Sequence, residues 1–482
     1  MYISESLEFK KNKLFIENHE ITQISNDSRD VINGSLFFLI EEDPALGKKY
    51  IEQAVNKGAA AIVVSNSSNF INQFDNSIIL RSKSVRKDLA KICSRFYEKY
   101  PKNIIAVTGT NGKTYVAKFT EQIWSKNGIL SASIGTLGNS KIQSDIALTT
   151  PDPISLHKQL ADLSDANFDN VIIEVSSHGL SQSRIDGLNF SGAAFTNFSR
   201  DHLDYHKNMI SYFNAKKRLF TELLTDSGTA VINKYMIPDK YHNFIDEIRS
   251  KKIVTIGNKN STIVIEKIYR RENQMVNLEC IINSKLVNVE TSFIASFQAI
   301  NSLIAACLST INTNISLMDS IKTISNLNNV IGRLERVAST GDNNYIYIDY
   351  AHTPDAIKSA LIELRQVTSN RLFLVFGAGG DRDIGKRVLM SAVASKYADY
   401  IIITDDNPRS EDPSKIRSEL MQNSEKFIEI SDRGEAISHA ISKLSNNDSL
   451  LICGKGHEGY IQYKDERVPF SDHATVSDIL SK

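Results

Sequence analysis

The sequence predicts an α/β protein whose sheets are mostly parallel, and three observations support this class. Short continuous apolar runs recur along the chain, as expected for strands that are buried on both faces of a sheet. Segments with helical periodicity separate these runs, which is the pattern of parallel strands joined by helices. The chain has 482 residues, too many for one ordinary hydrophobic core, so we expect two or three domains.

The N-terminal region is short and of mixed α/β character. Apolar runs at 36–40 and 59–64 indicate strands, and a helical pattern at 48–58 lies between them. A second helical pattern covers 85–99 and ends before Pro101, because the residue before a proline disfavours helical backbone.

A second unit begins with the buried strand 104–107, which runs directly into a glycine-rich loop. Three more strands alternate with helical patterns, at 171–175, 193–196 and 230–232. This alternation predicts a mostly parallel sheet. The stretch from about 253 to 294 is rich in strand signals but less regular, and we expect it to form an antiparallel appendage.

The last 150 residues or so contain a site that the pattern alone predicts. Four apolar runs read as strands of a parallel sheet, at 345–348, 372–376, 400–403 and 450–452. Each run is followed at once by a polar cluster, at 349–352, 379–383, 405–409 and 454–458. Because the carboxyl ends of parallel strands lie on one edge of a sheet, these clusters are expected to converge on one crevice.

Composition excludes several classes of partner. Lysine plus arginine equals aspartate plus glutamate at 56 each, so nucleic acid is not an expected partner. We read no signal peptide and no apolar run near the roughly 20 residues that span a bilayer, and therefore expect no membrane insertion. The four cysteines lack metal-ligand spacing and indicate free thiols of a cytoplasmic protein: Cys93, Cys280, Cys307 and Cys453.

The glycine-rich loop T-G-T-N-G-K-T at 108–114 predicts binding of nucleotide phosphate. Gly109 and Gly112 allow the backbone to approach phosphate oxygens, and Lys113 adds a positive charge. Thr114 can offer its hydroxyl to magnesium, while the helix that follows presents its first amides to the anion. The loop has the shorter G-x-x-G-K-T form, because the first glycine of the standard template is absent.

Other candidate metal ligands are ambiguous from the residues alone. Glu174 ends a predicted strand at the same edge as the loop, where it can bind a metal or pair with a buried cation. His202 and His206 lie four residues apart, a spacing more common for structural histidines. Lys216 stands in K-K-R, which reads as a solvated basic face of a helix.

Nine segments taken together resemble the Mur ligase family, and in particular its tripeptide-forming members. They occur in family order along nearly the whole chain, which makes coincidence negligible. The segments are G-T-N-G-K-T at 109–114, T-T-P-D-P at 149–153, E-V-S-S-H-G-L at 174–180, T-N-F-S-R-D-H-L-D-Y-H at 196–206, Y-F-N-A-K-K-R-L-F at 212–220, D-Y-A-H-T-P-D at 349–355, G-G-D-R-D at 379–383, D-N-P-R at 406–409 and G-K-G-H-E at 454–458.

The resemblance implies three domains and an ATP-dependent amide synthesis in peptidoglycan assembly. The implied domains are a UDP-sugar-binding domain at 1–98, a central ATPase at 99–331 and a Rossmann-like amino-acid-binding domain at 332–482. The γ-phosphoryl group of ATP would pass to the D-glutamyl carboxylate of UDP-N-acetylmuramoyl-L-Ala-D-Glu, and an amine would attack the acyl phosphate. The expected partners are therefore these small molecules, and we expect a monomer.

The resemblance also assigns site residues. Lys216 is expected to carry a carbamate, an anionic oxygen ligand for Mg²⁺, with Thr114, Glu174 and His202 completing the metal site. Lys113, Glu174, His202 and Lys216 form the implied catalytic set. Implied ATP contacts are Gly109, Thr110, Asn111, Gly112, Lys113, Thr114, Tyr115, Asn301, Arg333 and Asp349. Implied contacts to the UDP-N-acetylmuramoyl dipeptide are Asn26, Ser28, Thr149, Thr150, Ser176, Gln182 and Arg184.

The D-N-P-R segment decides which amino acid is expected. Arg409 can hold a carboxylate with two hydrogen bonds, which suits meso-diaminopimelate and its second amino-acid group. In the alternative, a lysine-adding member of the family, this arginine would have no carboxylate to pair with. The implied diaminopimelate-binding residues are Arg382, Asp406, Asn407, Pro408, Arg409, Gly454 and Glu458.

Two segments depart from the family pattern. Tyr115 stands where a small hydroxyl residue is expected after G-K-T, which alters packing near the nucleotide but keeps Thr114 as the magnesium ligand. Asp43, Pro44 and Ala45 replace a segment associated with uridine contacts, so we do not assign them to binding.

Two more distant readings are disfavoured. A folylpolyglutamate synthetase shares the ATPase core but is not expected to carry D-N-P-R or T-T-P-D-P. An inactive nucleotide-binding regulator is expected to have lost a member of the catalytic set, and all four members are present.

Overall fold

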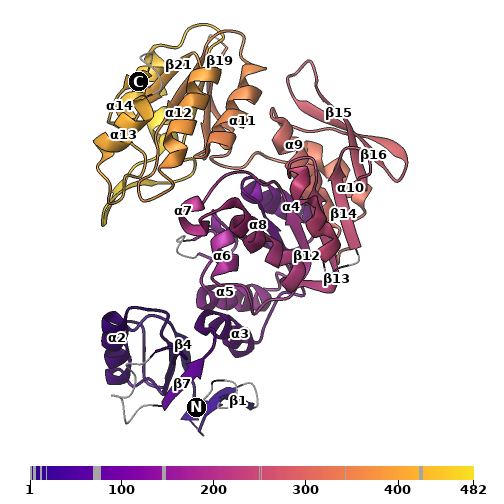
Figure 1. Ribbon diagram of the computed structural model, residues 1–482. Coiled ribbons are helices and arrows are strands. Elements are labelled where there is room, and N and C mark those ends of the chain that lie inside the picture. The colour runs from indigo at the N-terminus through magenta and orange to yellow at the C-terminus, as the bar shows by residue number, and fades with distance from the viewer. Residues whose placement is uncertain are drawn as a thin grey trace.

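The computed structural model describes residues 3, 7–10, 13–17, 19–68, 78–143, 148–248, 250, 252–341, 343–422 and 427–481. Its elements form α/β layers with mostly parallel sheets, so the predicted fold class is confirmed. Figure 1 shows three groups of elements that follow one another from the indigo N-terminal part to the yellow C-terminal part.

The N-terminal group contains a parallel sheet in the order β4-β5-β6-β7. Its helix α2 begins at Pro44, earlier than the sequence pattern predicted, because Asp43 caps it by accepting hydrogen bonds from the amides of Ala45 and Leu46. The strands are β4 (Gln23–Ser25), β5 (Ser35–Phe38), β6 (Ala61–Ser65) and β7 (Ile78–Ser82), and the helices are α2 (Pro44–Asn56) and α3 (Val85–Tyr97). A separate antiparallel sheet contains β1 (Leu7–Lys10), β2 (Lys13–Ile16) and β3 (His19–Glu20).

The central group is built on one ten-stranded sheet in the order β10-β9-β11-β8-β12-β13-β14-β15-β16-β17. The strands from β9 to β15 in this order run parallel, whereas β16 and β17 are antiparallel to their neighbours. The expected appendage is therefore an extension of the same sheet. The strands are β8 (Asn103–Thr108), β9 (Ser131–Gly135), β10 (Gly138–Asn139), β11 (Asn170–Glu174), β12 (Phe190–Phe195), β13 (Leu224–Asn233), β14 (Lys252–Gly257), β15 (Ile263–Arg270), β16 (Val276–Ile282) and β17 (Lys285–Val289).

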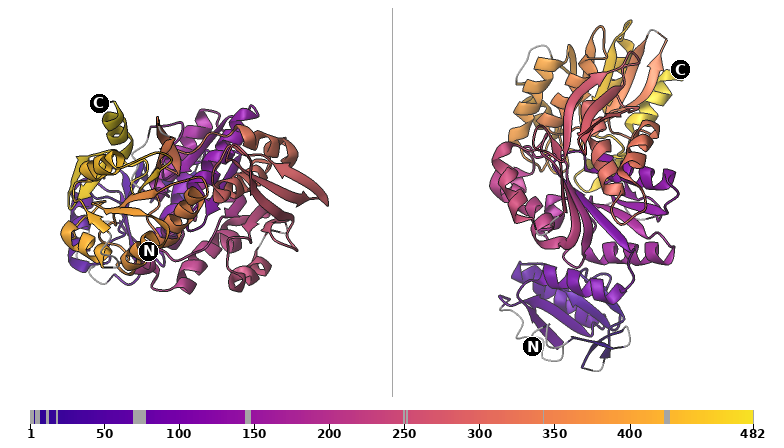
Figure 2. Two further views of the ribbon diagram at one scale, coloured as in Figure 1. Left: turned by 90° about the horizontal axis from the view of Figure 1, so that it is seen from above. Right: turned by 90° about the vertical axis from the view of Figure 1, so that its right-hand side faces the viewer.

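Helices cover both faces of this sheet, as the views in Figure 2 show. The buried side chains of α4 (Lys113–Lys126) and α9 (Ser296–Ser309) share one hydrophobic core with β8 and β11. On the other face, α5 (Pro153–Asp165) and α8 (Met209–Arg218) share a second core. Shorter helices are α6 (Ser177–Ser181), α7 (Leu203–His206) and α10 (Leu317–Thr323), with a π-helical turn at Leu219–Leu223 and 3₁₀ turns at Asp239–Glu247 and Ile324–Asn326.

The C-terminal group has a six-stranded sheet in the order β18-β19-β23-β20-β21-β22, and only β18 is antiparallel to its neighbour. The four strands predicted from apolar runs are adjacent in it, so the polar clusters that follow them share one edge. The strands are β18 (Glu335–Thr340), β19 (Asn344–Asp349), β20 (Leu372–Phe376), β21 (Tyr400–Ile403), β22 (Phe427–Glu429) and β23 (Ser449–Cys453), with a hairpin of β24 (Tyr460–Tyr463) and β25 (Glu466–Pro469). The helices are α11 (Pro354–Arg365), α12 (Gly385–Tyr397), α13 (Pro413–Met421), α14 (Arg433–Ser442) and α15 (Asp472–Leu480).

All four cysteines are free and buried. Among the described residues, no helix is both long and apolar enough to cross a membrane.

Candidate active site

A cavity of about 720 Å³ lies between the central group and the carboxyl edge of the C-terminal sheet. On one side it is lined by the glycine-rich loop and the start of α4. On the other side it is lined by residues from the four polar clusters that follow β19, β20, β21 and β23. Two sets of predicted residues that are far apart in sequence therefore face the same space.

The two loop glycines are required by close contacts. Gly112 has a φ of 84° and would place a Cβ atom 2.9 Å from Oδ1 of Asn301. A Cβ atom at Gly109 would lie 1.9 Å from Oγ1 of Thr196. The predicted nucleotide residue Asn301 therefore packs directly on the loop.

Two lysines meet at the carbonyl of Gly109. The Nζ of Lys113 donates to the carbonyls of Gly109 and Thr110, each at 2.9 Å. The Nζ of Lys216 donates to the same Gly109 carbonyl at 2.7 Å and lies 4.7 Å from the ring centroid of Tyr212. Lys216 is 1% exposed, so its prediction as a solvated basic face is wrong. Burial lowers the pKa of Lys113 and lowers the pKa of Lys216 much further, which favours a neutral amine at Lys216.

Hydrogen-bond donors hold the carboxylate of the predicted metal ligand Glu174. Thr114 donates from Oγ1 to Oε2 of Glu174 at 3.0 Å. Thr136 donates from its amide to Oε1 at 3.1 Å and from Oγ1 to Oε2 at 3.0 Å. Arg333 Nη2 donates to the Thr114 hydroxyl at 3.2 Å. The phosphate loop and the end of β11 are thus brought into direct contact.

His202, another predicted metal ligand, also lines the cavity. Its Nε2 lies 3.3 Å from Oδ2 of Asp201, and its ring centroid lies 4.8 Å from that of His178. Burial lowers the pKa of His202, which leaves a neutral imidazole that is able to bind a metal. Among the described residues, no three His, Cys, Asp or Glu side chains group as a metal site. The predicted ligand set fits Mg²⁺ only if Thr114 and Lys216 also contribute oxygen atoms.

Two further predicted nucleotide residues lie close together at the C-terminal sheet: Arg333 is in the linker before β18, and Asp349 ends β19. Asp349 accepts hydrogen bonds from the amides of Leu334 and Ala351. Burial raises the pKa of Asp349 to about 6, although the positive charge of Arg333 acts to lower it. The Arg333 guanidinium lies 4.1 Å from the ring centroid of Tyr350.

The predicted amino-acid residues form a network of their own at the carboxyl edge of the sheet. Asn407 donates from Nδ2 to Oε2 of Glu458 at 2.8 Å, and the buried Lys455 donates to both residues, at 3.0 and 3.1 Å. Arg409 donates from Nη1 to the carbonyl of Gly380 at 2.8 Å. Asp406 and Gly454 line the cavity beside them, as does the exposed Arg382, whereas Pro408 does not.

The residues predicted to bind the UDP-linked substrate lie in two separate parts of the structure. Thr149, Ser176 and Arg184 line the cavity, and Arg184 donates from Nη1 to the carbonyl of Thr150 at 2.7 Å and also bonds Gln182. By contrast, the structure does not bring the predicted residues between β4 and β5 to this cavity. They are the exposed Asn26 and the buried Ser28, whose hydroxyl donates to Gln53.

Several side chains of the site escaped sequence reasoning. The sequence analysis included Asp201 and Asn197 in the segment 196–206, and Lys455 in the segment 454–458, but gave none of them a role. Thr136 carries no motif, and only its contact with Glu174 reveals it.

Comparison with known proteins gives the lineage. Three family models match the chain: Mur ligase family, catalytic domain, at 20–97; Mur ligase middle domain, at 107–309; and Mur ligase, glutamate ligase domain, at 332–456. A UDP-N-acetylmuramoyl-L-alanyl-D-glutamate–2,6-diaminopimelate ligase of Agrobacterium fabrum is 40% identical over 96% of this chain and 94% of its own. The chain belongs to the Mur ligase family. A ligase of the same name from Rickettsia prowazekii is 37% identical over 98% of each chain.

Solved structures of Mur ligases share the fold. A UDP-N-acetylmuramoyl-L-alanyl-D-glutamate–2,6-diaminopimelate ligase superposes with a TM-score of 0.67 and 30% identity, over 96% of this chain and 95% of that one. A folylpolyglutamate synthase of Mycobacterium tuberculosis complexed with ADP has a TM-score of 0.62, with 18% identity over 77% of this chain and 90% of that one. The second likeness concerns the fold alone.

Proposed function

We propose that this Mur ligase uses ATP to join meso-diaminopimelate to the D-glutamyl carboxylate of UDP-N-acetylmuramoyl-L-Ala-D-Glu, in peptidoglycan precursor synthesis. One observation carries the proposal: a single cavity is lined by the phosphate loop and by the loop that contains Arg409. The relatives named for this reaction match nearly the whole chain. The division at 98 and 331, with a UDP-sugar-binding N-terminal domain, belongs to the same proposal.

The first half-reaction turns a poor electrophile into a reactive one. An oxygen of the D-glutamyl carboxylate attacks the γ-phosphorus, the bond to the β,γ-bridging oxygen breaks, and ADP leaves with that electron pair. The amides of the loop and Lys113 hold the phosphate groups, with Asn301, Arg333 and Asp349 on the nucleotide side. Bound Mg²⁺ would neutralise charge on the transferring group and would be held by Thr114, Glu174, His202 and a modified Lys216.

The modification of Lys216 is a carbamate. A neutral amine attacks carbon dioxide, an N–C bond forms, and one proton is lost to give an anion with two oxygen atoms. Its burial and lowered pKa support this, because an ammonium group could neither attack carbon dioxide nor bind a cation.

The second half-reaction consumes the acyl phosphate. The amine of diaminopimelate attacks the acyl carbon, phosphate leaves, and the nitrogen loses one proton to give the amide. Arg409 and Arg382 are the candidates to receive the distal carboxylate, and Glu458 the candidate to receive an ammonium group. Thr149, Thr150, Ser176, Gln182 and Arg184 would hold the dipeptide end of the other substrate, with Asn26 and Ser28 at its nucleotide end.

Incorporation of labelled amino acid tests the proposal. The enzyme is supplied with ATP, magnesium, the UDP-linked dipeptide and either meso-diaminopimelate or L-lysine, and labelled product is counted. We expect diaminopimelate to be used with a higher kcat/KM than lysine, and ADP release to require both acceptor and amino acid. Equal or better use of lysine would refute the specificity. No amide product with either amino acid would refute the activity itself.

A further inference from the structure

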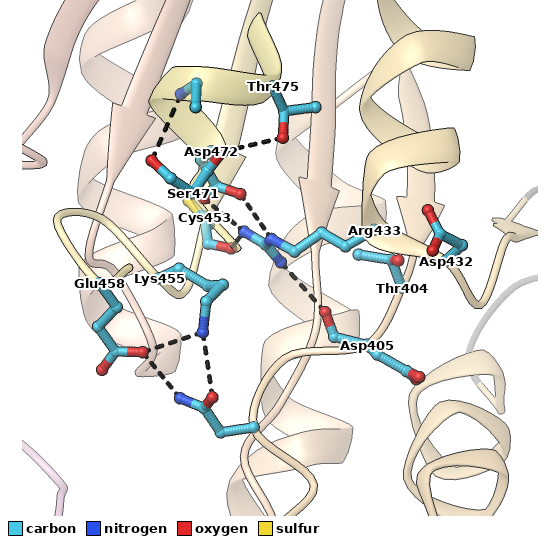
Figure 3. Close-up of polar contacts among 12 residues, drawn as sticks. Thr404, Asp405, Asp432, Arg433, Cys453, Lys455, Glu458, Ser471, Asp472 and Thr475 are labelled. Atoms are coloured by element: carbon cyan, nitrogen blue, oxygen red, sulfur yellow. Dashed lines mark hydrogen bonds and ion pairs between the residues drawn. The ribbon is translucent and has the colours of Figure 1, made fainter. Parts of the chain in front are cut away.

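A fully buried ion pair lies behind the proposed amino-acid site. Arg433 and Asp472 both have side chains that are 0% exposed, and Arg433 donates from Nε and Nη2 to the two carboxylate oxygens at 2.7 and 2.8 Å (Figure 3). Arg433 is the first residue of α14, where a positive charge opposes the helix dipole. A buried ion pair is also weak evidence for stability, because desolvation offsets its attraction. The helix dipole therefore disfavours this arginine, and the ion pair by itself is weak evidence that the residue serves stability.

The remaining hydrogen bonds of Arg433 point to another role. Its Nη1 donates to the carbonyl of Asp405 at 3.3 Å, and its Nη2 donates to the carbonyl of Cys453 at 2.8 Å (Figure 3). Asp405 directly precedes the D-N-P-R loop and Cys453 ends β23, directly before the G-K-G-H-E loop. In the sheet, β20 lies between β21 and β23, so no strand pairing joins the starts of these two loops. Arg433 makes that connection across the end of β20.

The cavity side of the same two loops is joined by a second set of bonds. Lys455 donates to Oε2 of Glu458 (Figure 3). It also donates to Oδ1 of Asn407, which itself bonds Glu458. The amide of Gln462 donates to Oδ1 of Asn407 at 2.9 Å, so this carboxamide is largely occupied within the protein. Backbone hydrogen bonds also tie Arg409 to Gln462 and Lys464, at the far end of the D-N-P-R loop. The starts of the two loops are therefore held by Arg433 from behind and by Lys455 from the front.

We propose that Arg433, held by Asp472, is a positioning residue that fixes the distance between the two loops that receive the incoming amino acid. It does not touch that substrate and acts only through the backbone at Asp405 and Cys453. The inference rests on the proposed function for the location of the amino-acid site. It predicts a loss of affinity for the amino acid with little change for ATP, because the phosphate loop lies on the other side of the cavity.

The test replaces both charges at once, so that no buried charge is left unpaired. In Arg433→Met with Asp472→Leu, we expect the KM for the amino acid to rise about 10- to 100-fold, because small displacements of substrate-holding groups have effects of this size. We expect the KM values for ATP and for the UDP-linked dipeptide to stay within about twofold, since Arg433 makes no hydrogen bond to a residue assigned to either substrate. The control is Arg371→Met with Asp448→Leu, which removes an ion pair of 2.9 Å, partly exposed at Arg371, in the same group of elements and away from the two loops.

A second variant covers the case in which the double variant does not fold. Arg433→Lys keeps a positive charge beside Asp472 but cannot reach both carbonyls, so we expect the same selective rise in KM, of smaller size. The inference is overturned if either folded variant keeps the wild-type KM for the amino acid, or if the control pair raises that KM equally. The amino acid used is whichever one the wild-type enzyme incorporates. If the wild-type enzyme prefers lysine, the proposed specificity is refuted. The KM values for lysine in the variants then still test the role of Arg433.

Discussion

At the scale of single residues, burial decides what the side chains of the site can do. Lys216 and Lys217 are neighbours on α8, yet Lys216 is buried against the Gly109 carbonyl while Lys217 pairs with Glu247 near the surface at 2.8 Å. The two residues have the same chemistry in an unfolded chain. Burial strongly lowers the pKa of Lys216.

Replacement of Lys216 tests the carbamate. We expect Lys216→Ala to lower kcat by about 1000-fold or more, a loss comparable to that of other groups that stabilise transition-state charge. The measurement is the initial rate of ADP release with all substrates present, with and without added bicarbonate. Bicarbonate should not restore the rate, because no amine remains to be modified. Lys217→Ala is the control and should behave as wild type; a rate near wild type in the Lys216 variant would contradict the assignment.

The raised pKa of Asp349 makes the stability of the folded protein depend on pH. Burial raises its pKa from 3.8 to about 6, so between these values the folded protein binds more protons than the unfolded chain. The contribution of Asp349 to stability is therefore largest below the lower value and is lost as the pH rises through the upper one.

The variant Asp349→Asn removes this titration. Its melting temperature minus that of the wild type should increase as the pH rises from 4 to about 6.5, and should be constant at higher pH, because charged Asp349 destabilises only the wild type. Scanning calorimetry across this range makes the measurement. Asp355→Asn, at the exposed start of α11, is the control. A difference that does not vary with pH would contradict the raised pKa.

At the scale of elements, α4 is tied to the linker before the C-terminal sheet. Tyr115, which departs from the family pattern, donates from its hydroxyl to the carbonyl of Arg333 at 2.6 Å and accepts from Gln298 Nε2 at 3.2 Å. Because Arg333 also donates to Thr114, the linker and the start of α4 share two hydrogen bonds. Tyr115 thus joins α4 to the linker, and its assignment as an ATP contact remains a prediction.

Removal of that hydroxyl tests the connection. We expect Tyr115→Phe to lower kcat/KM for ATP about two- to tenfold, since one net hydrogen bond is worth about 0.5–1.5 kcal/mol. Steady-state kinetics at varied ATP make the measurement. Tyr100→Phe removes a hydroxyl that donates to a backbone carbonyl, that of Ser94, outside the cavity lining and should leave this value unchanged. Equal effects in the two variants would show that the loss is only structural.

At the scale of the whole molecule, the site exists only where two groups of elements meet. Arg200, after β12, pairs with Asp383, after β20, at 3.2 Å, and the Arg200 side chain is 46% exposed. An ion pair of this kind holds the two sides of the cavity together only weakly.

The effect of Arg200→Ala should be small and dependent on salt. We expect the KM for the amino acid to rise about two- to fivefold at low ionic strength and to match the wild type at about 1 M salt, where the Debye length is about 3 Å. Lys102→Ala breaks an exposed pair with Asp169 outside the cavity lining and serves as the control. A rise that persists at high salt would contradict the electrostatic explanation.

The sequence by itself determined the class of the fold, the phosphate loop and the four polar clusters, because each depends on periodicity or on glycines within a few residues of one another. It also predicted the family, through nine short segments in order. It did not place the strands β15 to β17 in the central sheet, since pairing partners are set by packing and not by local pattern.

Only the tertiary structure decided which side chains are buried away from solvent and which groups they bond there. The pKa of Lys216 is lowered because α8 buries it against the Gly109 carbonyl of the phosphate loop, and Thr136 joins Glu174 across 38 residues of chain. Arg433 reaches the starts of two loops, which no strand pairing connects. In each case the physical cause is the same: desolvation and hydrogen bonding depend on atoms that only folding brings together, and a linear pattern of residue types does not contain those distances.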